Sequence, residues 1–446
     1  MSQHRFASHG GDDRRPRFFV VFLALALLLV ATASACGGDD EGNASGDTSE
    51  TASCPLDDGE VNIFSTADVS AVAGDITPMQ LRWIESEVPK INAAGGVLGC
   101  TLDIEVVDEP LPDFESGIRK YRAALASEEY DLYFAMFDSA LVRALPKFTN
   151  RAKKILILAG VGDHQPFYEE LEDPSYAMQA GVSTLGEGRA AAKFAADKGW
   201  KKIAILTPNY AYGQDVADAF KEYFLELVPD GEITTEQKPA FLEKNFQPFV
   251  NAVVASKPDA VFGGQYGADI ISLYKLWKAQ DLTIPTIFFT EQSVLEQLKP
   301  AQIPENSYGY DRGAPNILRE TPRGQYVWDA YSEEYGTSDH PTPGSYVFII
   351  DSAIQLVQAL AEKTNGFDAD AWTEAIKAGG FAYESAYQEE PTDVNHLNFE
   401  ANTCATVGLV KFSEELSQGF YDPEDSAHVC LDEVIDDEER EELIGR

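Results

Sequence analysis

Six short groups of polar, acidic and aromatic residues stand out in this 446-residue chain, because each directly follows a short apolar run. They are Ser65–Asp68, Phe137–Ser139, Gly160–His164, Asn209–Tyr212, Gln265–Tyr266 and Glu291–Gln292. If the apolar runs are parallel strands, these groups meet at the carboxyl edge of a sheet, where open α/β sheets bind ligands. Their hydroxyls, carboxylates, amides and phenols can form hydrogen bonds and ion pairs. The chemistry they predict is reversible binding of a small molecule.

Motifs for covalent catalysis and phosphate binding are absent from the sequence. It contains no G-x-S-x-G elbow, no G-x-x-x-x-G-K-[ST] loop and no H-E-x-x-H zinc motif. Glycine clusters at 160–165 and 186–191 depart from the G-x-G-x-x-G dinucleotide fingerprint, so we interpret them as turns. We therefore expect no enzymatic activity, no cofactor and no metal.

Three of the polar groups place a carboxylate after a predicted strand, at Asp138, Asp163 and Glu291. Facing one small volume, these buried charges would need partners. A ligand with a cation or several N–H donors would supply them. Four tyrosines could add cation–π faces: Tyr210, Tyr212, Tyr266 and Tyr346. Alternatively, Asp138 and Asp163 cap the helices that follow them, and the sequence leaves both interpretations open.

The apolar runs alternate with amphipathic segments in two successive series. The first series has strands at 61–66, 102–108, 131–137 and 154–160, with helices at 76–94, 113–127 and 138–149. The second has helices at 185–198, 214–227, 245–256 and 268–280, and strands at 202–208, 232–238, 260–265 and 286–291. Two further helices are expected at 322–335 and 345–363. This alternation predicts two doubly wound, Rossmann-like α/β lobes.

The amino terminus has the pattern of a secretory signal peptide at residues 1–35. A basic segment precedes 13 apolar residues, Phe18–Val30, and small residues follow. Cys36, followed by Gly-Gly-Asp-Asp, resembles the bacterial lipobox, in which the cysteine is acylated and becomes the first residue. We expect Cys36 to anchor the protein to the outer side of the cell membrane. A simple A-x-A cut at Ala33–Ala35, which would release the chain, is the alternative.

Charge and cysteine content restrict the partners and the compartment. Lys and Arg total 34 against 74 Asp and Glu, giving a formal charge of −40, which argues against binding nucleic acid or anionic lipid. Four cysteines remain after Cys36, and an even number outside the cytoplasm favours disulfides. Of the three possible pairings, we predict Cys54–Cys100 and Cys404–Cys430. Residues 36–58 should form a flexible tether, and 431–446 a solvated acidic tail.

Three segments resemble the leucine/isoleucine/valine-binding family of type I periplasmic binding proteins. They are EVPKINAAGGVLGCTLDIEVVDE (87–109), KKIAILTPNYAYGQDVADAF (201–220) and the strand–helix unit at 245–282. The resemblance covers about residues 60–415. It implies three crossovers between the lobes, near Gly181–Ser183, Asp311–Gly313 and Pro391–Asn395. Lobe 1 would then comprise 59–181 and 313–390, and lobe 2 would comprise 182–312 and 391–430.

The resemblance also implies ligand contacts at positions that match the family motifs. Tyr212 matches the tyrosine that closes from lobe 2, and Glu291 matches the acid that holds a ligand amine. The other matches are Ser139, the pair Gln265 and Tyr266, and Tyr346, while Ser65, Gly160 and Gly162 lie at the same edge. The loop Ala159–Asp163 lacks the hydroxyl that grips an α-carboxylate in the family. Asp163 would instead repel a carboxylate, which argues against a branched-chain amino acid.

Together these features predict a solute receptor that feeds an ABC importer. It would act as a monomer, close two lobes on a small polar molecule of the amino-acid, amide, urea or amine type, and deliver it to the transmembrane permease. A ligand-sensing or signalling surface lipoprotein on the same fold is the alternative.

Overall fold

The computed structural model describes residues 53–71, 76–109, 113–136, 139–160, 162, 176–265, 267–338, 341–395, 400–435 and 439. These residues belong to one compact unit, Thr51–Arg446. Several predictions fall outside the described residues: the signal peptide, Cys36, the tether up to residue 52, and the site residues Asp138, Asp163 and Tyr266. Among the described helices, none is both long enough and apolar enough to cross a membrane.

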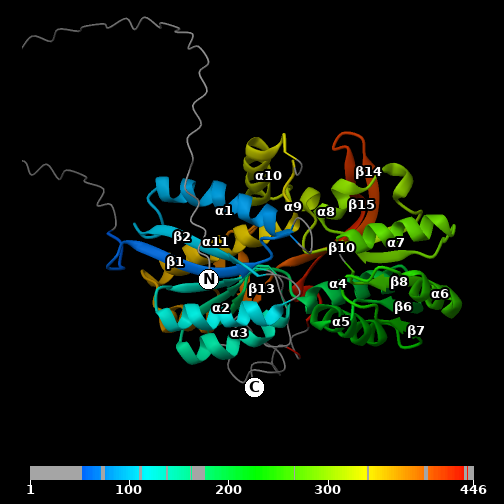
Figure 1. Ribbon diagram of the computed structural model, residues 1–446, viewed down its shortest axis with the longest axis horizontal. Coiled ribbons are helices and arrows are strands. Elements are labelled where there is room, and N and C mark those ends of the chain that lie inside the picture. Colours follow the sequence, from blue (N-terminus) through cyan, green and yellow to red (C-terminus); the bar gives the residue numbers. More distant parts are fainter. Residues whose placement is uncertain are drawn as a thin grey trace, which may run out of the picture. The chain divides into compact units, whose positions relative to one another are not determined.

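The first half of the chain builds most of an eight-stranded sheet. Its elements are β1 (Glu60–Ala67), α1 (Ile76–Ala93), β2 (Thr101–Asp108), α2 (Phe114–Ser127), β3 (Leu132–Ala135), α3 (Ser139–Ala152), β4 (Ile155–Leu158) and β5 (Ala177–Gln179). These five strands are parallel, in the order β5-β4-β3-β1-β2. Strands β3 and β4 are buried along their whole length, as expected for LYFA and ILIL runs covered on both faces. Helices α2 and α3 cover one face, and α1 with the later helix α11 (Ser345–Thr364) covers the other (Figure 1).

A seven-stranded sheet follows from the second series. Its elements are α4 (Thr184–Asp197), β6 (Lys202–Leu206), α5 (Ala211–Leu227), β7 (Glu232–Gln237), α6 (Gln247–Ser256), β8 (Ala260–Gly263), α7 (Ala268–Ala279), β9 (Thr286–Phe289), α8 (Gln292–Gln297), a 3₁₀ turn (Pro300–Gln302) and β10 (Ser307–Asp311). The parallel strands run in the order β10-β9-β8-β6-β7. The two doubly wound α/β lobes that the sequence predicts are therefore present.

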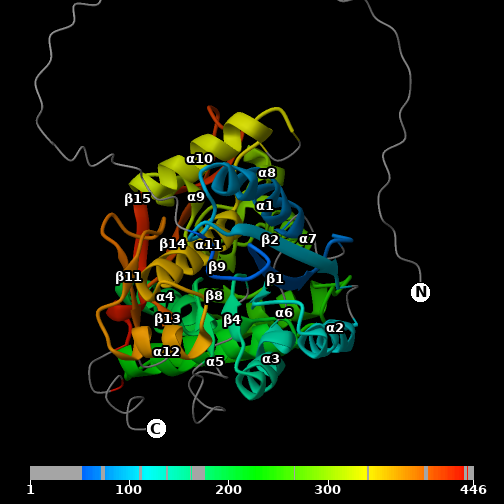
Figure 2. The ribbon, with the colours of Figure 1, turned by 90° about the vertical axis from the view of Figure 1, so that its left-hand side faces the viewer.

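The remaining elements return to both sheets. They are α9 (Pro315–Leu318), α10 (Pro322–Tyr335), α11 (Ser345–Thr364), α12 (Ala369–Lys377), β11 (Ala382–Tyr383), β12 (Thr392–Asn395), β13 (Glu400–Ala401), β14 (Cys404–Ser413), β15 (Gln418–Cys430) and a 3₁₀ turn at Leu431–Glu433. Strands β11, β12 and β13 extend the first sheet, and β14 and β15 extend the second (Figure 2).

Within the described residues, the chain passes between the sheets at 180–183, 312–314 and 402–403. The third prediction, at Pro391–Asn395 with lobe 2 resuming at residue 391, is wrong. β12 and β13 pair within the first sheet, where Glu400 lies beside Gln179 of β5, so the passage comes only after residue 401.

Both predicted disulfides, Cys54–Cys100 and Cys404–Cys430, are present. The first ties residue 54 to the start of β2, and Leu56 packs on the core, so the predicted tether of 36–58 extends too far by several residues. The predicted solvated tail is also wrong at its beginning, since Val434 and Ile435 are buried. Arg189 of α4 holds this segment through the Val434 carbonyl oxygen at 2.7 Å.

The glycine cluster at 186–191 is helical, so its interpretation as a turn is wrong. Gly188 lies where α4 packs on α5. A Cβ atom there would lie 2.7 Å from the Ala219 Cβ and 2.8 Å from both the Phe220 nitrogen and the Val216 oxygen. The glycine therefore permits the close approach of these two helices.

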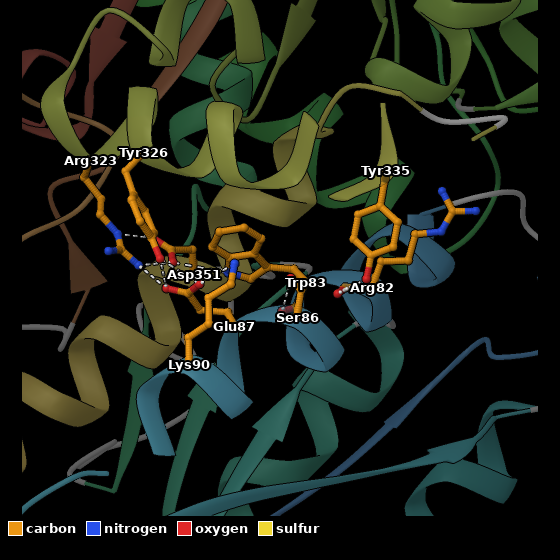
Figure 3. Close-up of polar contacts among 9 residues, drawn as sticks. All are labelled: Arg82, Trp83, Ser86, Glu87, Lys90, Arg323, Tyr326, Tyr335 and Asp351. Carbon is orange, nitrogen blue, oxygen red and sulfur yellow. Dashed lines mark hydrogen bonds and ion pairs between the residues drawn. The ribbon is translucent and has the colours of Figure 1, made fainter. Parts of the chain in front are cut away.

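An ion-pair cluster joins α1, α10 and α11 (Figure 3). The Arg323 Nε atom donates to Asp351 at 2.9 Å, and the Trp83 indole nitrogen donates to the same carboxylate at 3.2 Å. Glu87 lies 3.4 Å from Arg323 and accepts a hydrogen bond from the Tyr326 hydroxyl at 2.9 Å. Asp351 is fully buried, so this cluster fixes α11 against its two neighbours.

Candidate ligand-binding site

Buried polar side chains without hydrogen-bond partners occur at the carboxyl edges of both sheets. Five residues that end or follow a strand, or begin a helix, have a buried side-chain atom without a partner: Ser139, Thr207, Gln265, Ser345 and, through its Oδ2 atom, Asp311. Each is at most 2% exposed. In Gln265, both the amide oxygen and the amide nitrogen lack a partner. Since an unsatisfied buried polar group costs about 1–3 kcal/mol, this arrangement suits a bound molecule that supplies the missing partners.

Arg312, in the second passage between the sheets, is the central cation of this region. Its Nε atom lies 2.7 Å from Glu187 of α4, and its side chain also contacts the Tyr346 hydroxyl on α11. The guanidinium carbon lies 5.2–5.3 Å from the ring centres of Tyr212, Phe289 and Tyr346. Arg312 is 1% exposed, and it connects an element of each sheet.

Burial shifts the pKa values of Glu187 and Arg312. Loss of solvent raises the pKa of Glu187 to about 7, although the nearby Arg312 guanidinium acts to lower it. The Glu187 carboxylate in turn raises the pKa of Arg312, which remains charged. The ion pair is therefore the form we expect above neutral pH.

Tyr212 and Tyr346 were predicted as ligand contacts, and the structure brings both to Arg312. The Tyr212 hydroxyl also lies 3.1 Å from the Tyr310 hydroxyl, and its ring centre is 6.1 Å from that of Tyr210. The two aromatic rings that could flank a cationic ligand thus already flank a guanidinium. A quaternary ammonium held in an aromatic cage is consequently not the ligand that these two rings suit.

Glu291 is fully buried at the start of α8, beyond strand β9. Its carboxylate caps this short helix by accepting a hydrogen bond from the Ser293 backbone nitrogen at 2.7 Å. Burial raises the pKa of both Asp311 and Tyr346, and the Glu291 charge adds to both shifts, so Glu291 lies close to the Arg312 region. Capping and ligand contact are compatible, because a carboxylate accepts several hydrogen bonds.

Three other predicted ligand contacts of lobe 1, Ser65, Gly160 and Gly162, make contacts within the fold. The Ser65 hydroxyl donates to the Phe134 carbonyl oxygen at 3.0 Å, within the sheet. A Cβ atom on Gly160 would lie 1.7 Å from the Met136 carbonyl oxygen. Gly162 accepts a hydrogen bond at 2.6 Å from the Thr184 nitrogen, which links its loop to the first passage.

An ion pair also connects α3 of the first sheet with α5 of the second. Arg143 lies 3.9 Å from Asp215. Asp215 is fully buried and also contacts the Thr184 hydroxyl. Sequence reasoning missed Arg312, Glu187 and Asp311. The available signal was the Asp-Arg-Gly at 311–313, which the sequence analysis recognised only as a crossover.

Comparison with known proteins gives a family and a fold. The family model of periplasmic binding proteins matches residues 63–414. A solute-binding protein of an ABC transporter from Rhodopseudomonas palustris BisB5, solved with 3,4-dihydroxybenzoic acid, aligns with a TM-score of 0.70 at 19% identity, covering 84% of this chain and 99% of that one. LivJ from Streptococcus pneumoniae, solved with isoleucine, gives 0.67 at 15% identity, covering 83% and 99%. No curated protein sequence matches this chain.

Proposed function

The chain belongs to the periplasmic binding protein family, and on this premise we propose that it is the extracytoplasmic solute receptor of an ABC importer. It binds one small polar molecule between two lobes that close about the three passages, and it delivers that molecule to the transmembrane permease. It acts as a monomer and catalyses no reaction on the solute.

The set of unpartnered polar side chains at the carboxyl edges carries this proposal. Ser139 begins α3 in the lobe of the first sheet, whereas Thr207 and Gln265 follow β6 and β8 of the second, so a molecule satisfying all three would contact both lobes. Hydrogen bonds that form only with ligand stabilise the closed form over the open one. This is the behaviour that a capture-and-release receptor requires.

The solute that these groups suit is small and rich in hydrogen-bonding groups. Gln265 offers one acceptor and two donors, and Ser139 and Thr207 each offer a hydroxyl. An amino acid, amide, urea or amine would satisfy such a set. The related structures contain isoleucine in one case and a dihydroxybenzoic acid in another, so the fold accommodates different solutes.

We propose that Cys36 anchors the receptor to the membrane as an acylated first residue. Each buried CH₂ of an acyl chain contributes about 0.8 kcal/mol to membrane binding. Mass spectrometry of the protein extracted from membranes of the native host should find a diacylglyceryl group on Cys36. An unmodified Cys36, or a first residue further along the chain, would contradict the anchor but not solute capture.

Thermal-shift screening of a metabolite library tests the binding function directly. A ligand at 100 times its Kd stabilises the folded form by about 2.7 kcal/mol. The hit is then titrated against two variants. Gln265→Leu should weaken binding and leave the ligand-free protein as stable as before, because it removes an unsatisfied amide.

Gln280→Leu is the matched control for this variant. The Gln280 amide nitrogen is also buried without a partner, but it lies at the end of α7, away from the carboxyl edge. It should leave affinity unchanged. The proposal is wrong if no solute stabilises the folded protein, and the site lies elsewhere if Gln265→Leu binds the hit as tightly as the native chain.

A further inference from the structure

Side chains outside the three passages also join the two lobes. Arg143 of α3, in the lobe of the first sheet, lies 3.9 Å from Asp215 of α5, in the lobe of the second. Asp215 is fully buried, whereas the Arg143 side chain is 24% exposed. Asp215 also contacts the hydroxyl of Thr184, which directly follows the first passage. An ion pair therefore links the helix after β3 to the helix after β6.

A second contact joins α8 to the segment that precedes α11. The Gln292 Nε2 atom, at the start of α8 in the second lobe, donates a hydrogen bond at 2.7 Å to the Thr342 hydroxyl oxygen. The Thr342 hydroxyl in turn donates to the Glu296 carboxylate of α8 at 3.3 Å. Thr342 leads into α11, which lies with α1 on the first sheet (Figure 1). The Gln292 and Thr342 side chains are both buried, so this contact also spans the lobes.

Gly344 allows a close approach at the second contact. A Cβ atom on Gly344 would lie 3.2 Å from the Cβ atom of Gln292 and 3.0 Å from the Cε atom of Met79 on α1. Residue 344 therefore lies between a helix of each lobe, and Met79 is fully buried. A side chain at this position would require its neighbours to shift. The sequence is thus fitted to the arrangement in which the lobes lie together.

These contacts can form only while the lobes are together. On opening, water would replace the Arg143–Asp215 and Gln292–Thr342 interactions, so the net gain from each is small. Each should favour the closed form about three- to tenfold, which is the range of a net hydrogen bond. The two contacts share no residue, so their effects should multiply. Both use only side chains of the chain itself and form with or without solute.

We propose that Arg143–Asp215 and Gln292–Thr342 form an interlobe latch, which keeps the receptor closed between encounters with solute and thereby controls both entry and release. This inference rests on the proposed function and assigns four positioning residues to it. Solute can enter only after the latch opens, and it can leave only after the latch opens again. The latch therefore sets the rate of exchange more than the affinity.

Hydroxyl-radical footprinting of the full chain without solute tests the latch directly, because it measures the exposure of single side chains. Tyr212 and Tyr346 belong to different lobes and are each 3% exposed, so their oxidation reports opening. Tyr133 of β3 and Phe262 of β8 are fully buried within one lobe each, so their oxidation reports unfolding.

Two nearly isosteric variants remove one contact each. Asp215→Asn and Thr342→Val should each raise the oxidation rates of Tyr212 and Tyr346 about three- to tenfold, and the combined variant by about the product. Tyr133 and Phe262 should stay unreactive. If either variant also exposes them, Gly344→Ala provides a second route, because it separates the lobes by steric contact and should give the same opening.

Lys198→Met is the matched control. Lys198 of α4 lies 2.7 Å from Asp425 of β15, and its side chain is 28% exposed, similar to that of Arg143. This ion pair lies within the second lobe, so its removal should not change the oxidation of Tyr212 or Tyr346. The inference is overturned if these tyrosines react as fast in the native chain as in the combined variant.

Stopped-flow kinetics test the consequence for the solute, with L-glutamine, acetamide, urea and ethylamine as probes. For a probe that binds, Asp215→Asn and Thr342→Val should raise the association and dissociation rate constants by similar factors, about three- to tenfold. The Kd should then stay within about twofold, because the closed form still predominates. A rise in the dissociation rate constant alone would mean that the residue contacts the solute, and it would overturn the latch.

The outcomes separate this inference from the proposed function. If the variants change neither tyrosine oxidation nor the rate constants, the latch is wrong while solute capture stands. If no solute from the metabolite library binds, the proposed function fails. Footprinting needs no solute, so it still decides whether these side chains hold the lobes together.

Discussion

Replacing Arg323 with alanine tests whether the cluster of Figure 3 fixes α11. Asp351 is fully buried, and among its contacts within the described residues the substitution leaves the hydrogen bond from the Trp83 indole. Removing one member of a buried ion pair costs about 3–5 kcal/mol, because the other charge stays desolvated. The Arg323 side chain is 19% exposed, so water can reach the vacated volume. We therefore expect the lower end, about 3 kcal/mol.

Calorimetric unfolding at pH 7 measures this loss. For a cooperative unit of roughly 150–250 residues, about 3 kcal/mol corresponds to a fall in melting temperature of about 6–12 °C. Lys90→Ala is the control. Lys90 is 47% exposed and lies 3.6 Å from Glu87, so its removal should cost about 0–1 kcal/mol. Since α11 begins at Ser345 and Tyr346, Arg323→Ala should also weaken solute binding.

The double variant Arg323→Ala/Asp351→Asn distinguishes a lost ion pair from lost packing. Removing both charges relieves the unpaired carboxylate, so the double variant should be more stable than Arg323→Ala alone. The reasoning is refuted if Arg323→Ala unfolds within about 1 kcal/mol of the native chain, the range of an exposed pair. It is also refuted if the two substitutions destabilise additively, because independent costs would mean that the charges do not interact.

Three further outcomes are expected. Gly188→Ala should lower the free energy of unfolding by about 1–3 kcal/mol, because its Cβ atom meets backbone atoms of α5. Gly366→Ala is the control, since the space around Gly366 is open and the substitution should not destabilise the protein. Equal melting temperatures of the two variants would contradict the packing argument. Desolvation lowers the pKa of the half-buried His428, so the unfolded chain takes up a proton first as pH falls below about 6.5. In urea titrations, the free energy of unfolding of the native chain should then fall relative to that of His428→Asn by up to about 1.4 kcal/mol per pH unit. If the free energies of unfolding of the two proteins change with pH in parallel, this expectation is wrong. Replacing Cys404 and Cys430 together by serine should cost about 2–5 kcal/mol in denaturant unfolding under oxidising conditions, and an unchanged midpoint would show that this disulfide does not constrain the chain.

The central strands of both sheets were predictable because the sequence pattern that identifies them is local. Strands such as LYFA and ILIL are continuous apolar runs, and the helices between them repeat their apolar residues with helical spacing. β5, with three residues, and β10, with the sequence SYGYD, have no such run and were missed. The extension of the first sheet by β12 and β13 depends on pairing with β5, far away in the chain, and no local pattern encodes it.

The candidate site was predictable only in part, for a similar reason. Tyr212 and Tyr346 follow from motif position, and the structure brings both to one guanidinium. Arg312 itself was missed because an isolated arginine is usually at the surface. Its burial depends on Glu187, which precedes it by 125 residues. Asp215 of α5 is likewise fully buried beside a distant residue, Arg143 of α3.

The three passages between the sheets also determine when folding can finish. Neither sheet has all its strands until residues 392–430 are available, because β12 and β13 complete the first sheet and β14 and β15 complete the second. Pairings between distant parts of a chain raise the contact order and slow folding. A chain emerging from a ribosome or a translocation channel would expose unpaired edges of β5 and β10 until its last segment arrives. Export in an unfolded state, followed by folding outside the membrane, suits this order of assembly.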